Sequence, residues 1–114
     1  MTNLELDTVT VAQDGAIATL TLNRPEARNA INAQMCRDLL TATAQLGNDD
    51  SVRVVLVRGA GKVFCAGMDI KEQQSLSTSD MLGRRPLGFT AYRALEPLPK
   101  AVICVAHGSA YGGG

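Results

Sequence analysis

The sequence of 114 residues has few aromatic side chains and no excess of either charge. It contains no tryptophan, and aromatic residues make up 4% of the chain, which argues against a surface that stacks nucleic-acid bases. Lysine and arginine together number 11, as do aspartate and glutamate, so the formal net charge is zero. The net charge therefore gives no indication of a surface for nucleic acid or an anionic membrane, and we expect neither as a partner.

Cysteine is also scarce, and the chain has a single histidine. Cys36, Cys65 and Cys104 are odd in number and far apart, which predicts neither a disulfide framework nor a metal site. The N-terminus lacks the basic and apolar regions of a signal peptide, and the apolar stretch Ala101–Ala106 is far too short to cross a bilayer. We therefore expect reduced thiols in a soluble, cytoplasmic protein.

The residues that are present have an ordinary globular balance, 46% apolar and 19% charged, at the length of one modest domain. Loose alternation predicts a strand over Leu4–Ala12, and Asp14-Gly15 is a hairpin turn signal. The partner strand is predicted over Ala16–Leu22. A polar loop containing proline follows over residues 23–29.

The middle of the chain predicts a helix followed by a strand. Asn32 is a candidate N-cap, and Gly47-Asn48 would close the helix. The residues between them at helical spacing are Met35, Cys36, Leu39, Leu40, Thr43 and Leu46. The β-branched run Val52–Val57 suits a strand buried on both faces.

The last third alternates again between helix and strand signals. Asp69 is expected to cap a short helix beginning at Ile70, and the small polar residues of Ser75–Arg85 predict a mobile surface loop. Pro86–Leu95 is predicted as a helix with its proline at the first position, and Ala101–Ala106 as a second buried strand. Alternating strands and helices indicate an α/β layer arrangement.

Two loops have the composition needed for chemistry at the backbone. Ala66–Asp69 and Gly108–Gly114 each follow a predicted buried strand and contain glycine, which permits close approach of the backbone. Amides left unpaired in two such loops can bind one developing oxyanion, as an enolate or a tetrahedral intermediate requires. The alternative is that these glycines only form turns.

Two better-known glycine motifs do not fit. Gly108–Gly114 fails the dinucleotide-binding pattern G-x-G-x-x-G, because Ala110 occupies the position of the second glycine. Gly59–Lys62 is not a phosphate-binding loop, because Leu56 stands where that motif needs its first glycine and Val63 follows the lysine. Nucleotide phosphate binding by either motif is therefore not predicted.

Three segments resemble the enoyl-CoA hydratase/isomerase superfamily, the crotonases. Asn23–Asn32 (NRPEARNAIN) is similar to that family's N-R-P-x-x-x-N-A loop, and Phe64–Glu72 (FCAGMDIKE) is similar to its F-x-A-G-x-D-(L/I)-K-E segment. Pro99–Gly114 (PKAVICVAHGSAYGGG) resembles its K-P-(V/T)-I-A-A-V-N-G-x-A-x-G-G-G segment. The order and the intervals agree across essentially the whole chain.

The resemblance implies roles for individual residues. The backbone amides of Met68 and Gly113 would form the oxyanion hole for an acyl-CoA thioester. Coenzyme A would be bound as part of the substrate, with no prosthetic group. The residues implied in holding it are Arg28, near the CoA phosphates, Ala30, and the segment Ala66, Gly67, Met68, Asp69 and Ile70.

Three neighbouring side chains are expected to have structural and not catalytic roles. Asp69 is expected to cap the following helix and not to react. His107 is expected to make a structural hydrogen bond, because many relatives carry asparagine there. Cys65 is interpreted as a small buried residue, since nothing nearby in the sequence lowers the pKa of its thiol.

The resemblance also implies a fold, an assembly and an incomplete site. The fold would be the crotonase-like ββα spiral core, with residues 1–114 as the N-terminal portion of a single domain. The catalytic carboxylates of hydratases follow the glycine triplet, so the chain is expected to be part of a longer product whose acid/base residues lie beyond Gly114. Relatives form trimers and dimers of trimers, which is the expectation for the full-length protein.

The reaction type stays open at this point. An enoyl-CoA hydratase or isomerase is the first hypothesis. The same half-site also suits a crotonase-type decarboxylase or hydrolase. A non-catalytic or truncated CoA-binding or assembly module is the alternative from a different functional class.

Overall fold

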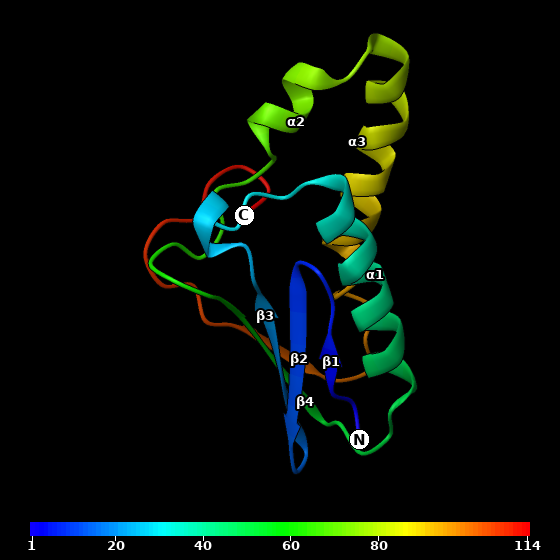
Figure 1. The fold of residues 1–114 in the computed structure, drawn as a ribbon. Coiled ribbons are helices and arrows are strands. Elements are labelled where there is room, and N and C mark those ends of the chain that lie inside the picture. The colour runs from blue at the N-terminus through cyan, green and yellow to red at the C-terminus, as the bar shows by residue number, and fades with distance from the viewer.

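The computed structural model describes residues 1–114 as a five-stranded sheet with helices, shown in Figure 1. The strands lie in the order β1-β2-β3-β4-β5. The first three are antiparallel neighbours, whereas β3, β4 and β5 run parallel. The elements are β1 (Leu4–Glu5), β2 (Val9–Asp14), β3 (Ile17–Leu22), the 3-10 turn η1 (Pro25–Ala27), α1 (Ala33–Asn48), β4 (Val54–Gly59), α2 (Ile70–Ser75), α3 (Thr78–Arg93) and β5 (Ala101–Cys104). None of the helices has the length and apolar character needed to cross a membrane.

The N-terminal hairpin confirms the predicted turn and corrects the predicted first strand. Asp14 pairs with Ile17 across a two-residue loop, and Gly15 adopts a φ of +60° there, which glycine tolerates without strain. The predicted strand Leu4–Ala12 is divided into β1 and β2. The chain turns at Thr8, whose amide and hydroxyl both donate to Asp38 Oδ2, at 2.9 and 2.7 Å. The Asp38 carboxylate, which belongs to α1, thus accepts the bond from the Thr8 amide that a partner strand would accept if one strand continued through Thr8.

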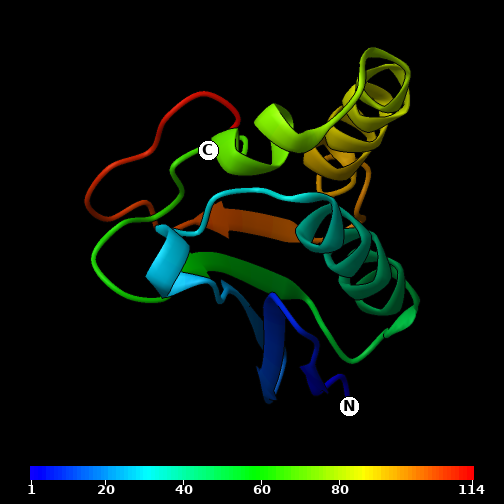
Figure 2. The same ribbon diagram turned by 45° about the horizontal axis from the view of Figure 1, so that its top comes forward.

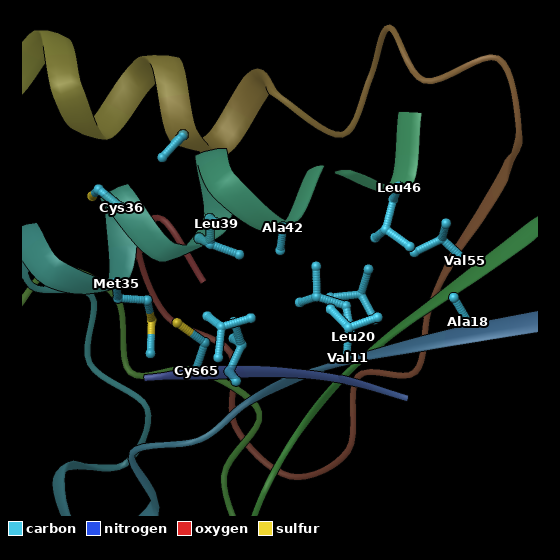
Figure 3. Close-up of a cluster of buried hydrophobic side chains, with 14 of the residues drawn as sticks. Val11, Ala18, Leu20, Met35, Cys36, Leu39, Ala42, Leu46, Val55 and Cys65 are labelled. Carbon is cyan, nitrogen blue, oxygen red and sulfur yellow. The ribbon is translucent and has the colours of Figure 1, made fainter. Parts of the chain in front are cut away.

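Helix α1 begins as predicted and packs across one face of the sheet (Figure 2). Asn32 Oδ1 accepts a hydrogen bond from the Met35 amide at 2.8 Å, which satisfies one of the free donors of the first turn. Figure 3 shows side chains of α1 pointing toward side chains of the sheet. The buried core residues of α1 are Met35, Cys36, Leu39, Ala42 and Leu46, and those of the sheet are Val9, Val11, Ala18, Leu20, Leu22, Val55 and Val57.

The two strands predicted to be buried on both faces are covered on one face at most. Strand β4 begins at Val54, two residues after the predicted start, and its buried residues alternate with half-buried or exposed ones. Strand β5 ends at Cys104, earlier than predicted, and only Val102 is not exposed. β5 is an edge strand of the described sheet, which leaves most of its apolar residues exposed.

Helix α3 replaces most of the loop predicted over Ser75–Arg85. It starts at Thr78, where the Ser77 hydroxyl accepts from the Asp80 amide at 3.1 Å as an N-cap. The predicted helix start at Pro86 is therefore wrong, and this proline lies inside α3. The hydrogen bond that Pro86 cannot donate would have gone to the carbonyl of Leu82, a residue exposed to solvent, which reduces the cost of the missing donor.

Candidate functional site

The first loop junction pairs residues 28–31 with residues 66–69. The Ala66 amide donates to the Arg28 carbonyl at 3.0 Å. The Ile31 amide donates to the Gly67 carbonyl at 2.7 Å, and the Asp69 amide donates to the Ile31 carbonyl at 3.0 Å. Two segments that are distant in the sequence thus run side by side as a short parallel ladder.

The second junction joins the same region to the C-terminal glycine loop, which lies beside it in both ribbon views (Figures 1 and 2). The Tyr111 amide donates to the Cys65 carbonyl at 3.0 Å, and the Phe64 amide donates to the Ser109 carbonyl at 3.1 Å. Gly67 has a φ of +87°, and a Cβ there would lie 2.6 Å from the Tyr111 carbonyl oxygen. Only glycine permits both this conformation and this approach.

Asn29 fixes the base of both junctions. Its side chain is fully buried, and its Nδ2 lies within hydrogen-bond distance of the carbonyls of Ala60, Val63 and Phe64, at 2.9, 2.9 and 3.1 Å. Its Oδ1 accepts from the Arg24 amide at 2.8 Å. Sequence reasoning missed this residue. The signal available was an asparagine inside a loop, a residue type that tolerates the left-handed conformation found here, with φ of +55°.

The amides of Met68 and Gly113 donate no hydrogen bond within the chain. In the parallel ladder the neighbours of Met68 provide the bonded carbonyl and amide, so its own N–H is directed away from that ladder. In the glycine loop the Gly114 amide donates to the Tyr111 carbonyl at 2.7 Å, whereas the neighbouring Gly113 amide donates to no group of the chain. Both amides belong to residues that line one cavity.

This cavity has a volume of about 320 Å³ and lies between the two loops and α3. Its lining residues are Met68, Arg85, Gly88, Phe89, Tyr92, Gly112 and Gly113. No carboxylate or histidine is among them. The residues present therefore provide hydrogen-bond donors and apolar surface, and no side chain suited to removing a proton from carbon at neutral pH.

Helix α3 supplies the wall of the cavity that sequence reasoning missed. Arg85, Gly88, Phe89 and Tyr92 follow the i, i+3, i+4, i+7 spacing that places residues on one helix face. Arg85 lies in the segment predicted as a loop, whereas Gly88, Phe89 and Tyr92 lie within the predicted helix Pro86–Leu95. The signal for the earlier start of α3 was a Ser-x-x-Asp pair at Ser77, which is typical of a helix start.

The enoyl-CoA hydratase/isomerase family model matches residues 12–114. The chain belongs to the enoyl-CoA hydratase/isomerase family. It is 38% identical over 112 residues to a short-chain-enoyl-CoA hydratase of Clostridium acetobutylicum, and the match covers 97% of this chain and 43% of that protein. It is 40% identical over 106 residues to a 1,2-epoxyphenylacetyl-CoA isomerase of Escherichia coli, covering 86% of this chain and 39% of the relative.

Solved structures of the family share the fold. An enoyl-CoA hydratase from Bacillus anthracis matches with a TM-score of 0.90 at 28% identity, over 95% of this chain and 43% of that chain. An enoyl-CoA hydratase of Mycobacterium smegmatis matches with a TM-score of 0.84 at 36% identity, over 89% of this chain and 40% of that one. The predicted crotonase-like fold is thus confirmed, and the chain spans less than half the length of these relatives.

The residues that the family resemblance assigned to coenzyme A are brought together by the first loop junction. Arg28 is exposed at the end of η1, with a φ of +53°. Ala30 and Ala66 are half-buried, and Gly67 is buried between them and the glycine loop. Ile70 begins α2 with 66% of its surface exposed. Of this set, Met68 alone also lines the cavity beside α3.

Asp69 caps α2, as predicted. Its Oδ1 accepts from the Glu72 amide at 3.1 Å, and its Oδ2 pairs with Arg24 Nη1 at 3.0 Å. Burial opposes ionisation of the carboxyl, but the hydrogen bonds from the Glu72 amide and Arg24 outweigh it and hold the pKa of Asp69 below its ordinary value. A carboxylate held in this way is a structural anion.

The interpretations of Cys65 and His107 are also confirmed. Cys65 is buried, and burial raises the pKa of its thiol. Its Sγ donates to the Asn29 carbonyl at 3.2 Å. His107 Nε2 lies 3.0 Å from the Gly61 carbonyl oxygen. Both side chains therefore hydrogen-bond to backbone carbonyls of neighbouring loops and help to hold those loops in place.

A partly buried ion pair anchors α3 beside the site. Arg84 Nε donates to Glu72 Oε1 at 2.7 Å, and Arg84 Nη2 donates to the Ile31 carbonyl at 2.8 Å. Glu72 Oε2 accepts from the Ala33 amide at 2.8 Å. Arg84 Nη1 is buried without a hydrogen-bond partner. Through this pair α1, α2 and α3 are joined directly beside the Met68 loop.

Proposed function

We propose that the chain binds an acyl-CoA thioester and that its full-length protein is an enoyl-CoA hydratase or isomerase. The amides of Met68 and Gly113 would hold the thioester oxygen while an enolate forms. The observation that carries this proposal is that these two amides are free of partners inside the chain and belong to residues lining the same cavity.

The physical basis is electrostatic. Enolate formation moves negative charge onto the thioester oxygen, and two fixed N–H donors stabilise that charge without reorganisation. Removing a single donor of this kind typically costs about 3–4 kcal/mol of transition-state stabilisation. We infer that the thioester carbonyl enters the cavity beside α3, with its oxygen toward the two loops.

The body of coenzyme A would lie along the first loop junction, as part of the substrate. Arg28 offers an exposed guanidinium for a phosphate. The adjoining Ala30, Ala66 and Gly67 have small side chains or none, which would allow a flat ring system to approach the backbone closely, and Met68, Asp69 and Ile70 continue this segment. No separate prosthetic group enters this proposal.

The acid and base for hydration or isomerisation would come from the rest of the full-length protein, since the cavity lining here contains no carboxylate. That same observation supports the alternative, a CoA-binding or assembly module without turnover. For the full-length protein we also propose a homotrimer or a dimer of trimers and a cytoplasmic location.

The test compares two ligands that differ at one atom. Butyryl-CoA has the thioester oxygen, whereas S-butyl-CoA, a thioether, has the same chain without it. At about 0.5–1.5 kcal/mol for each hydrogen bond, two amide donors predict roughly 5- to 150-fold tighter binding of the thioester in titration calorimetry. The infrared C=O stretch of bound butyryl-CoA should also move to lower frequency than in solution.

Three outcomes would distinguish between these proposals. Equal affinity for the two ligands, with no carbonyl shift, would overturn the oxyanion role and support the non-catalytic CoA-binding module. Loss of binding to coenzyme A and both derivatives in a folded sample would contradict both functions. Water addition to crotonyl-CoA by the full-length protein would favour hydratase over isomerase.

A further inference from the structure

Tyr92 lies at the boundary between two cavities. It lines the cavity that contains Met68 and Gly113, and it also lines an adjacent, mainly apolar cavity between α1, α3 and the sheet. Gly113 is the only other residue shared by the two linings. Tyr92 and Gly113 together therefore form the wall between the proposed carbonyl site and the apolar space beside it.

The phenol end of Tyr92 packs directly against Gly113. A Cβ added to Gly113 would lie 2.7 Å from Tyr92 Cζ and 2.8 Å from its hydroxyl oxygen. One helical turn earlier, the absence of a side chain at Gly88 leaves room beside the same hydroxyl, since a Cβ there would lie 3.6 Å from it. The hydroxyl is thus adjacent to the residue whose amide is free.

The ring is held by an aromatic neighbour on the same helix face. Phe89 and Tyr92 form an edge-to-face pair with ring centroids 6.4 Å apart and an angle of 83° between the planes. This is one of the two arrangements that aromatic rings prefer. It restricts the direction in which the Tyr92 hydroxyl can point.

The hydroxyl itself makes no hydrogen bond with any group of the chain. The charged or titratable groups that influence it are Cys36 of α1, Arg84 of its own helix and Cys65 of the first loop. Burial is the largest influence and raises the pKa of Tyr92, with the Arg84 guanidinium opposing it. The phenol is therefore protonated at neutral pH and retains a proton to donate.

We propose that Tyr92 donates a hydrogen bond from its hydroxyl to the thioester oxygen, as a third donor beside the amides of Met68 and Gly113. This inference rests on the proposed function. A neutral phenol adds a donor without adding charge, and it strengthens its bond as the oxygen becomes negative. No proton is transferred and no covalent bond changes at Tyr92.

Tyr92→Phe removes only the hydroxyl, and the matched control is Tyr111→Phe. Tyr111 is the one other tyrosine, 62% of its surface is exposed, and it lines neither cavity. We expect Tyr92→Phe to weaken butyryl-CoA binding roughly three- to tenfold and to move the bound C=O stretch back toward its solution frequency. Binding of S-butyl-CoA should be unchanged, and Tyr111→Phe should leave all three values unchanged.

A second measurement uses the unmodified chain. With ¹³C at the Cζ of tyrosine, the two tyrosines give two NMR signals, and the Tyr92 signal should shift when butyryl-CoA binds while that of Tyr111 stays. An unchanged carbonyl stretch in Tyr92→Phe, or an unmoved Tyr92 signal on binding, would overturn the third donor while leaving the two amides intact. Absence of any thioester binding by the unmodified chain would overturn the proposed function and this inference with it.

Discussion

At the scale of single residues, Asn29 connects two loops with one buried amide group. It pairs with carbonyls at residues 60, 63 and 64 and with the Arg24 amide. Buried backbone groups without partners cost about 1–3 kcal/mol each. Replacing this side chain therefore affects the free energy of unfolding and the shape of the site together.

Asn29→Ala is expected to lower the free energy of unfolding by about 2–4 kcal/mol, because several buried backbone groups lose their partner. Urea denaturation measures this loss. Asn23→Ala is the control, since Asn23 is exposed in the same loop and its side chain makes no hydrogen bond. Similar losses in the two variants would contradict the role assigned to Asn29.

Local rules located some polar residues of the site and missed others. The capping roles of Asn32 and Asp69 follow from a side chain bonding an amide three residues later, which sequence alone reveals. The three carbonyls near Asn29 Nδ2 belong to residues 31–35 positions away. No local pattern contains that information, so the residue was missed.

At the scale of elements, α3 is the main difference between prediction and structure. Its sequence is rich in small and polar residues, and two glycines and a proline lower its intrinsic helix propensity. The contacts that hold this helix are made with residues distant in the sequence. Arg84 reaches Glu72 and the Ile31 carbonyl, and Ala91 packs in the core. Packing therefore decides that this segment is a helix.

Gly83→Ala tests that helix within the segment predicted as a loop. A Cβ at Gly83 would meet no atom within 4 Å, so we expect a gain of roughly 0.5–1 kcal/mol from helix propensity. The contrasting variant is Gly15→Ala, where a Cβ is equally free of contacts but φ is +60°. Urea denaturation should show that variant to be less stable than the unmodified chain. A destabilised Gly83→Ala would contradict the helix.

At the scale of the whole molecule, two carboxylates connect distant parts of the chain. Asp69 pairs with Arg24. Asp49, at the end of α1, accepts from the hydroxyls of Ser51 and Thr2, which lower its pKa to about 2. The folded state lowers both pKa values below their ordinary value of 3.8. The two carboxylates therefore stabilise the fold above pH 3.8, and this stabilisation is lost as the pH falls through their pKa values in the folded state.

Asp69→Asn should reduce the acid sensitivity of the fold, because asparagine still caps α2 but has no charge to lose. The urea midpoint of the unmodified chain should fall more steeply between about pH 5 and about pH 2 than that of the variant. Asp50→Asn is the control, because Asp50 is exposed and accepts no hydrogen bond. Parallel pH profiles for Asp69→Asn and the unmodified chain would exclude this contribution.

The sequence by itself determined the family, the hairpin, the helix α1 and the two glycine loops. The hairpin, the helix and the glycine loops depend on short-range rules: the spacing of apolar residues, a cap and its amide, and glycine where φ is positive. The family follows from three segments whose order and intervals match. The predicted location and assembly of the protein remain predictions. The resemblance also supplied Met68 and Gly113 as candidates, before any geometry was known.

Only the tertiary structure decided which groups share a cavity. Met68 and Gly113 are 45 residues apart, and two ladders formed through backbone hydrogen bonds bring them to one space. The wall of that space comes from α3, which is anchored by a partly buried ion pair and by the packing of Ala91 in the core. Tyr92 gained its place beside Gly113 from that packing, because contacts between distant segments are set by the fold as a whole and not by neighbouring residues.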